Sequence, residues 1–292
     1  GNDKGGFFVQ KSSASKSAPL GTIIRTNGQG GEYYVGMLAS AWSSSRLNCK
    51  LYVLGNNGAI KKSWTVTQDT YSFNGLSTYY DGSITVYIEQ EDGKYHLSFS
   101  ADYGLETTSY GAYNLAIAVY PATGNADVNM WGGDYSYFKT IITTSEHTWT
   151  RGTDDMSVSD EATIPDAIAV GAYVSKTNVK NYQGTNISYY YSGTLNDIAN
   201  FSSYAISSLS PSGEVLPWIT APGSQVVSGV NHYHTASVDE YSYFHEYNSG
   251  ILVVNNTKYP YGVMEGTYGD KYVAAGIVAL WLQAAQSVGK EI

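Results

Sequence analysis

The sequence has few charged residues and no long apolar run. Charged side chains make up 14% of the 292 residues, against roughly 25% in an average globular chain. The net charge is −9 and the 16 basic residues are scattered, so the chain lacks the basic patch that nucleic-acid binding requires. Because no apolar run reaches the length of about 18 residues that a membrane-spanning helix needs, we expect no transmembrane segment.

Cysteine is almost absent as well. Cys49 is the single cysteine, so an intrachain disulfide is excluded, and no Cys/His spacing indicates a zinc site. Cys49 stands inside the strand-like segment LNCKLYVLG and is predicted to be a small buried core residue.

Tyrosine is the residue in excess, with 28 Tyr against 7 Phe and 6 Trp. Tyr, Ser, Thr, Asn and Gly therefore carry the polar character that ion pairs supply in most cytosolic enzymes. This composition favours a β-rich protein that is secreted or attached to the cell surface.

Residues 1–154 alternate short strand-like segments with turns. Turn sequences such as NGQGG, GNNG and EDGK separate candidate strands at intervals of roughly 8–15 residues. Ile84, Val86 and Ile88 alternate with polar or amphipathic residues, which is the period of a half-buried strand. We predict an antiparallel β-sandwich or jelly-roll domain over 1–154.

Residues 155–292 follow a different pattern, with longer apolar runs. The runs at 166–174, 216–223 and 249–257 are typical of strands covered on both faces of a parallel sheet, although the third could belong to a hairpin. Together with an apolar helix near the C-terminus, they predict an α/β core for this second domain.

That helix is apolar on nearly every side, which predicts a buried central helix. Leu280 and Trp281 belong to one apolar face, and Thr267 is the predicted N-cap, with Asp270 completing a capping box. Gly276 is expected to let another element approach closely, so Gly276→Leu should destabilise the protein by roughly 1–3 kcal/mol.

Four segments resemble the C-terminal half of subtilisin-like serine peptidases (subtilases, peptidase family S8). They follow the family's order over residues 165–285 and read PDAIAVGAYV, NDIANFSSYA, ITAPGSQVVSGVN and GTYGDKYVAAGIVALWLQAA. The last segment stands where the family's nucleophile motif, Gly-Thr-Ser-Met-Ala-Xaa-Pro, leads into its central helix. The resemblance implies a partial subtilisin-like parallel-sheet core, preceded by an inserted β-sandwich.

The resemblance places Tyr268 where the family has its nucleophilic serine. A phenol with a pKa near ~10 is a poor acyl acceptor. Asn2 would be the end of the family's oxyanion-asparagine motif. The remaining motif and cleft positions are Gly266, Thr267, Ala221, Pro222 and Gly223. The family's catalytic aspartate and histidine lie N-terminal to everything matched, and the chain contains no His-Gly pair.

These features predict a secreted or cell-surface peptidase homologue that is inactive as a single chain and binds a protein or peptide. Two alternatives stay open. One is an active serine endopeptidase completed by an upstream segment or a partner chain, and the other is a β-sandwich module that binds glycan or protein. No cofactor is expected, and structural calcium is considered only because the family often binds it.

Two groups of polar residues could bind a metal but fit solvated loops better. His232 and His234, with acidic residues and His245 downstream, show no ligand spacing that enforces a site. Glu89, Glu91 and Asp92 are adjacent carboxylates of the kind that is usually solvated in a turn. We therefore assign no metal ligand from the sequence.

Overall fold

The computed structural model describes the greater part of the chain. The chain divides into two compact units, Gly5–Asp154 (the N-terminal unit) and Gly1–Lys4 with Asp155–Ile292 (the C-terminal unit). The described residues are 6–26, 37–74, 79, 82–101, 113–133, 136–139, 148–164, 166–181, 184–187, 193–205, 215–229, 231, 250–254 and 257–290.

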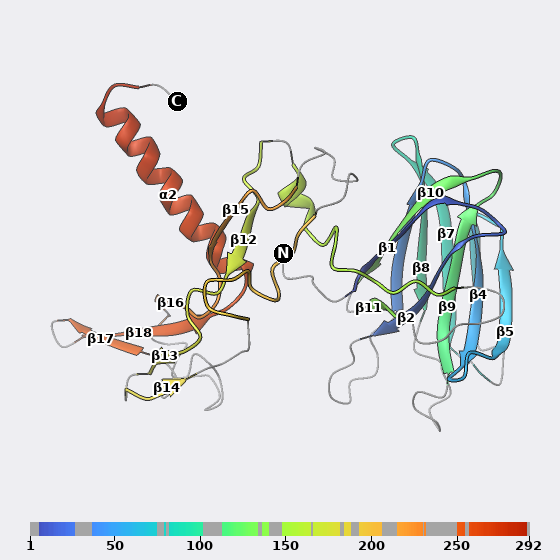
Figure 1. Ribbon diagram of the computed structural model, residues 1–292, viewed down its shortest axis with the longest axis horizontal. Coiled ribbons are helices and arrows are strands. Elements are labelled where there is room, and N and C mark those ends of the chain that lie inside the picture. Colours follow the sequence, from blue (N-terminus) through green and yellow to red (C-terminus); the bar gives the residue numbers. More distant parts are fainter. Residues whose placement is uncertain are drawn as a thin grey trace. The chain divides into compact units, whose positions relative to one another are not determined.

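The N-terminal unit consists of two antiparallel sheets (Figure 1). The six-stranded sheet has the order β1 (Phe8–Ala14), β10 (Ala126–Gly133), β3 (Met37–Ser43), β8 (Lys94–Ala101), β7 (Ser83–Glu91), β6 (Thr70–Asn74). The five-stranded sheet has the order β11 (Ser136–Lys139), β2 (Leu20–Thr26), β9 (Tyr113–Pro121), β4 (Leu47–Gly55), β5 (Ile60–Val66). The antiparallel β-sandwich predicted for this half is therefore present.

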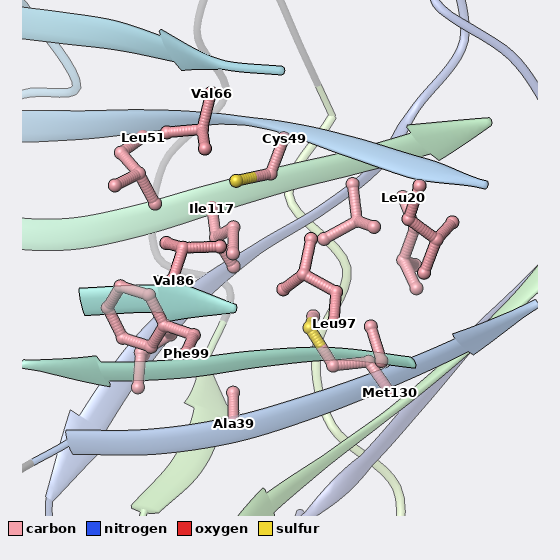
Figure 2. Packing of buried hydrophobic residues seen from close by; sticks show 14 of the residues in the cluster. Leu20, Ala39, Cys49, Leu51, Val66, Val86, Leu97, Phe99, Ile117 and Met130 are labelled. Carbon is pink, nitrogen blue, oxygen red and sulfur yellow. The ribbon is translucent and has the colours of Figure 1, made fainter. Parts of the chain in front are cut away.

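The two sheets enclose one hydrophobic core (Figure 2). Val86, Leu97 and Phe99 of the six-stranded sheet face Leu51 and Ile117 of the five-stranded sheet, and all five are buried. Alternation along β7 places its other side chains on the outward face, as the period of two predicts.

Cys49 lies in the same core and is fully buried. Burial raises the pKa of its thiol to about 12, because a thiolate cannot be solvated there. The prediction that Cys49 is an inert core residue is confirmed.

The central strands of the five-stranded sheet are buried on both faces. On the face away from the sandwich core, Trp149 packs on Tyr52, with ring centroids 5.4 Å apart in an edge-on geometry. The segment carrying Trp149 is held by hydrogen bonds from Thr150 N to Gly21 O at 2.7 Å and from Thr22 Oγ1 to Thr150 O at 2.8 Å. These contacts explain why β4 and β9 are apolar in nearly continuous runs.

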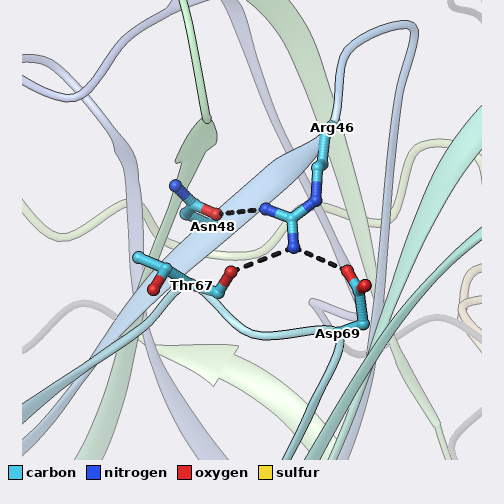
Figure 3. A network of polar contacts seen from close by, with 4 residues as sticks. All are labelled: Arg46, Asn48, Thr67 and Asp69. Atoms are coloured by element: carbon cyan, nitrogen blue, oxygen red, sulfur yellow. Dashed lines mark hydrogen bonds and ion pairs between the residues drawn. The ribbon is translucent and has the colours of Figure 1, made fainter.

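A polar network joins β4 to the segment between β5 and β6 (Figure 3). The Arg46 guanidinium donates to Asn48 Oδ1 at 3.0 Å, to the Thr67 carbonyl at 2.9 Å and to Asp69 Oδ1 at 2.6 Å. Because Asp69 is largely exposed, we expect this ion pair to add little stability.

The C-terminal unit contains three small sheets and a single α-helix among its described residues. Only β12 (Val170–Tyr173) and β15 (Ile219–Pro222) pair in parallel there. The antiparallel strands are β13 (Val179–Lys180) with β14 (Asn186–Ile187), and β16 (Val226–Gly229) with β18 (Thr257–Met264) and β17 (Gly250–Val254). A 3₁₀ helix, η2, spans Asp160–Thr163.

The α-helix, α2 (Thr267–Ser287), packs one narrow face on β12 and β15. Ala274 is buried on that face, whereas Leu280 and Trp281 are 64% and 68% exposed. The N-cap is Gly266, with φ 126°, and no side chain caps the helix. Thr267 is thus the first helical residue, and the predicted capping box is wrong.

The predicted fold class is also wrong. The described residues are mostly antiparallel sheet, and the one parallel pair has two four-residue strands. Among the described residues no subtilisin-like parallel core surrounds a central helix, since α2 is exposed along most of its described surface. A Cβ at Gly276 would meet no atom within 4 Å, so the close approach predicted there is absent from the described structure.

Candidate functional site

The predicted motif residues meet where α2 begins. Ala221 and Pro222 end β15, Gly223 follows the strand, and Gly266 N donates to Gly223 O at 2.9 Å. The backbone of Gly223 lies so close to β12 that a Cβ added at this glycine would be only 2.4 Å from the Cβ of Ala172. The two glycine-containing segments are therefore held side by side through their backbones.

A buried polar group lies beside this junction. Ser224 Oγ donates to Glu265 Oε1 at 3.1 Å, while Glu265 Oε2 is buried with no hydrogen-bond partner. Desolvation raises the pKa of the Glu265 carboxyl, and the Ser224 hydrogen bond partly opposes that shift. Gln225, directly next in the chain, also has a buried amide oxygen without a partner. The two unpaired oxygens are acceptors, so the group could receive a hydrogen-bond donor at this position.

The described residues of the junction do not include the histidine base of a serine–histidine–acid relay. Tyr268 lies in the first turn of α2, but its side chain lies outside the described part of the structure. Asn2, His232 and His234 lie outside the described residues too. His96, the one histidine that the structure describes, belongs to the N-terminal unit.

A second polar site, which the sequence analysis did not identify, lies on the outward face of the six-stranded sheet. The strand register places Trp42 on β3, His96 on β8 and Glu89 on β7 in one row across adjacent strands. Ser40 Oγ and His96 Nε2 share a 2.7 Å hydrogen bond, and His96 Nδ1 lies 3.4 Å from Glu89 Oε1. The row thus contains a hydroxyl, an imidazole and a carboxylate in sequence.

The surroundings of this row oppose nucleophilic catalysis, although the order of groups matches a serine–histidine–acid relay. Trp42 Nε1 donates to Ser40 Oγ at 3.1 Å, and the indole stacks on the His96 ring at 4.2 Å between centroids and 13° between planes. β3 and β8 are interior strands, so the sheet ladders engage their backbone N–H groups and leave none to hold an oxyanion. We interpret the row as a rigid polar site without acyl-transfer chemistry.

Comparison with known proteins gives a likeness in structure but none in sequence. No protein-family model matches the chain, and no curated protein sequence matches it. The fold is similar to that of a protease. The structure of the Clostridium perfringens CspB protease superposes with a TM-score of 0.54 at 14% sequence identity, over 97% of this chain. The chain spans about half of that protein, covering 47% of its length.

The resemblance to the subtilisin-like serine peptidase family, as read from the sequence, is overturned. No family model supports it, the identity to the protease structure is only 14%, and the described residues show mainly antiparallel sheet with one exposed helix. The comparisons and the structure support a less specific description of the chain. The fold is distantly similar to a protease, and among the described residues no helix is both long and apolar enough to cross a membrane.

Proposed function

We propose that the chain functions by binding polypeptide, with the surface of α2 as the binding surface, and that it does not act as a peptidase by itself. The observation that carries the proposal is the exposure of large apolar side chains along the helix. Their exposed fractions range from 44% to 71%, and they are Tyr272, Ile277, Leu280, Trp281 and Leu282. So much exposed apolar surface on one element is typical of an interaction site.

The arrangement of these side chains indicates what kind of partner fits. At about 100° per residue, Tyr272, Trp281 and Leu282 point to three different sides of α2. A second copy pairing helix against helix would cover a single stripe of roughly 100°. Enclosing the helix therefore requires a partner with several elements, and the proposed partner is a folded polypeptide other than a second copy.

The small parallel sheet next to α2 supports the same partner. β12 and β15 form a sheet of two strands, and β15 has no second strand neighbour among the described residues. Parallel sheets normally have more strands and are covered on both faces. Ile219 in β15 is 45% exposed. A partner that adds a strand beside β15 would cover this residue and part of α2 together.

The comparison with the CspB protease is compatible with such a partner, since more than half of that longer chain has no counterpart in this one. Among the described residues no histidine belongs to the C-terminal unit, so the described junction lacks the imidazole base of a serine peptidase, which favours binding over catalysis. The composition of the chain favours a secreted or cell-surface location for this interaction.

Site-specific photo-crosslinking tests the proposal directly. Benzoylphenylalanine would replace Tyr272, Ile277 or Trp281, one position at a time, in the chain expressed in the cells that produce it. A fourth variant carrying it at Tyr87, which is 51% exposed in the N-terminal unit, serves as the control. Mass spectrometry of the products identifies the cross-linked residues.

The expected result is that all three α2 positions cross-link to the same polypeptide, with contacts on different elements of it, and that position 87 does not. Trp281→Lys should abolish the cross-linking from position 272, whereas Gln283→Lys, also exposed on α2, should leave it intact. Cross-links confined to α2 of a second copy, or none from any α2 position, would overturn the proposal.

A further inference from the structure

Glu89, Glu91 and His96 form a group of metal-ligating side chains on the hairpin of β7 and β8. One ligand atom from each residue can be chosen so that all lie within 4.8 Å of one another. Glu89 and Glu91 are two residues apart on β7, so both side chains are on its outward face. Glu89 lies directly opposite His96 in the register. The three residues therefore meet on one face because of strand pairing, although seven positions separate Glu89 from His96 in the sequence.

The imidazole of His96 is held in a fixed orientation. Trp42 stacks on the ring, and Ser40 Oγ is bonded to Nε2 at 2.7 Å. Ser40 Oγ has two lone pairs, so it can accept from Trp42 Nε1–H and also from His96 Nε2–H. That tautomer leaves the Nδ1 lone pair directed toward Glu89. Ligating histidines in proteins typically have this arrangement, with the second ring nitrogen bonded to a neighbouring group.

The two carboxylates can adjust to an ion. The Glu89 side chain is 65% exposed, whereas that of His96 is 16% exposed. Zinc–ligand bonds of about 2.0–2.2 Å require ligand atoms closer together than 4.8 Å. Small rotations of the exposed glutamates supply that change without moving the imidazole or the sheet.

We infer that Glu89, Glu91 and His96 bind a divalent transition-metal ion, of which Zn²⁺ is the best fit, on the outward face of the sandwich. An imidazole nitrogen with two carboxylate oxygens suits Zn²⁺, Cu²⁺ and Ni²⁺ better than Ca²⁺, which prefers six or more oxygen ligands. Three protein ligands leave at least one coordination position open to solvent. The site belongs to the N-terminal unit and is independent of the function proposed for α2.

Lys94 is the basic group that opposes the ion. It lies opposite Glu91 in the register of the hairpin, where its ammonium competes for the same carboxylate. Removing the charge of Lys94 should strengthen metal binding. The inference can therefore be tested by a gain of affinity in this variant as well as by a loss of affinity in variants of the ligands.

Zn²⁺ binding to the full chain, prepared without a histidine tag, tests the site by isothermal titration and by metal analysis after dialysis. The parent should bind one Zn²⁺ per chain. Glu91→Gln and His96→Gln should each weaken binding at least tenfold, while Lys94→Gln should tighten it several-fold. Asp69→Asn is the control for Glu91→Gln, because it also removes one negative charge from the N-terminal unit. Asp69 contacts Arg46 and not the proposed site, so this variant should bind Zn²⁺ with unchanged affinity.

Co²⁺ provides a second readout, because its visible absorption reports on the ligands themselves. The parent spectrum should change in Glu91→Gln and stay the same in Asp69→Asn. Glu91 is exposed, so its substitution does not threaten folding. Absence of stoichiometric Zn²⁺ binding, or binding that persists at parental affinity in both Glu91→Gln and His96→Gln, would overturn the inference.

Discussion

Replacing Gly276 with leucine shows whether helix α2 is exposed or enclosed, because the substitution should raise the free energy of unfolding in the first case and lower it in the second. A side chain at this position meets open space, since no atom lies within 4 Å of its Cβ. Glycine costs about 1 kcal/mol relative to alanine inside a helix, and leucine lies close to alanine. An apolar contact with Leu280 one turn away adds roughly 0.2–0.5 kcal/mol. Gly276→Leu should therefore raise the free energy of unfolding by about 1 kcal/mol.

The assay is urea unfolding of the purified chain followed by circular dichroism at 222 nm, where α2 gives the main helical signal of the described structure. Gly223→Ala is the control in the same unit, because its Cβ would lie 2.4 Å from Ala172 Cβ. That variant should be destabilised, since neither backbone segment can yield easily. A loss of roughly 1–3 kcal/mol in Gly276→Leu would refute the reasoning and mean that other parts of the free chain enclose the helix.

Three further predictions concern the sandwich. Burial raises the pKa of the Cys49 thiol from the reference value of 9.0 to about 12. Because the folded state holds the thiol proton more tightly than the unfolded state, the protonated thiol's contribution to stability is complete below pH 9 and is lost as the pH rises toward 12. The difference in unfolding free energy between the parent and Cys49→Ala should fall by about 2 kcal/mol from pH 8 to pH 10.5, and a constant difference would contradict the burial. Phe99→Ala should cost roughly 3–5 kcal/mol in urea unfolding, whereas Tyr87→Ala on the opposite face should stay within about 0.5 kcal/mol; equal losses would contradict the assignment of faces. Arg46→Met should lower the free energy of unfolding by no more than about 1 kcal/mol, and by less in high salt. A larger loss that salt does not change would show that the ion pair with Asp69 is stronger than its exposure implies.

The sandwich was predictable because each strand carries its own pattern. Ile84, Val86 and Ile88 are buried and Tyr87 is exposed, as the alternation in β7 predicts. Cys49 was recognisable as a core residue because apolar neighbours surround it in a strand-like run. Such local regularities need no knowledge of which strands become neighbours.

The polar row on the outward face could not be predicted in the same way. Ser40, Glu89 and His96 come from three strands, and only the pairing of β3 with β8 and of β8 with β7 brings them together. Glu89 and Glu91 were recognised in the sequence as a carboxylate pair, and solvation was the better interpretation. A histidine in the second strand of the same hairpin, His96, is the signal that could have distinguished a metal site from solvated carboxylates. That inference requires the pairing register of the two strands, which the sequence does not state.

The sequence by itself determined the strands of the sandwich, the burial of Cys49 and the position and all-round apolar character of α2. These properties depend on residues that are close together in the chain. Only the tertiary structure decided that β12 and β15 form a parallel pair with no further strand from the described residues, that α2 covers this pair with one narrow face, and that Leu280 and Trp281 face outward. An apolar helix can be enclosed by its own chain or remain open to a partner, and its sequence is the same in both cases, because burial depends on which other elements reach it.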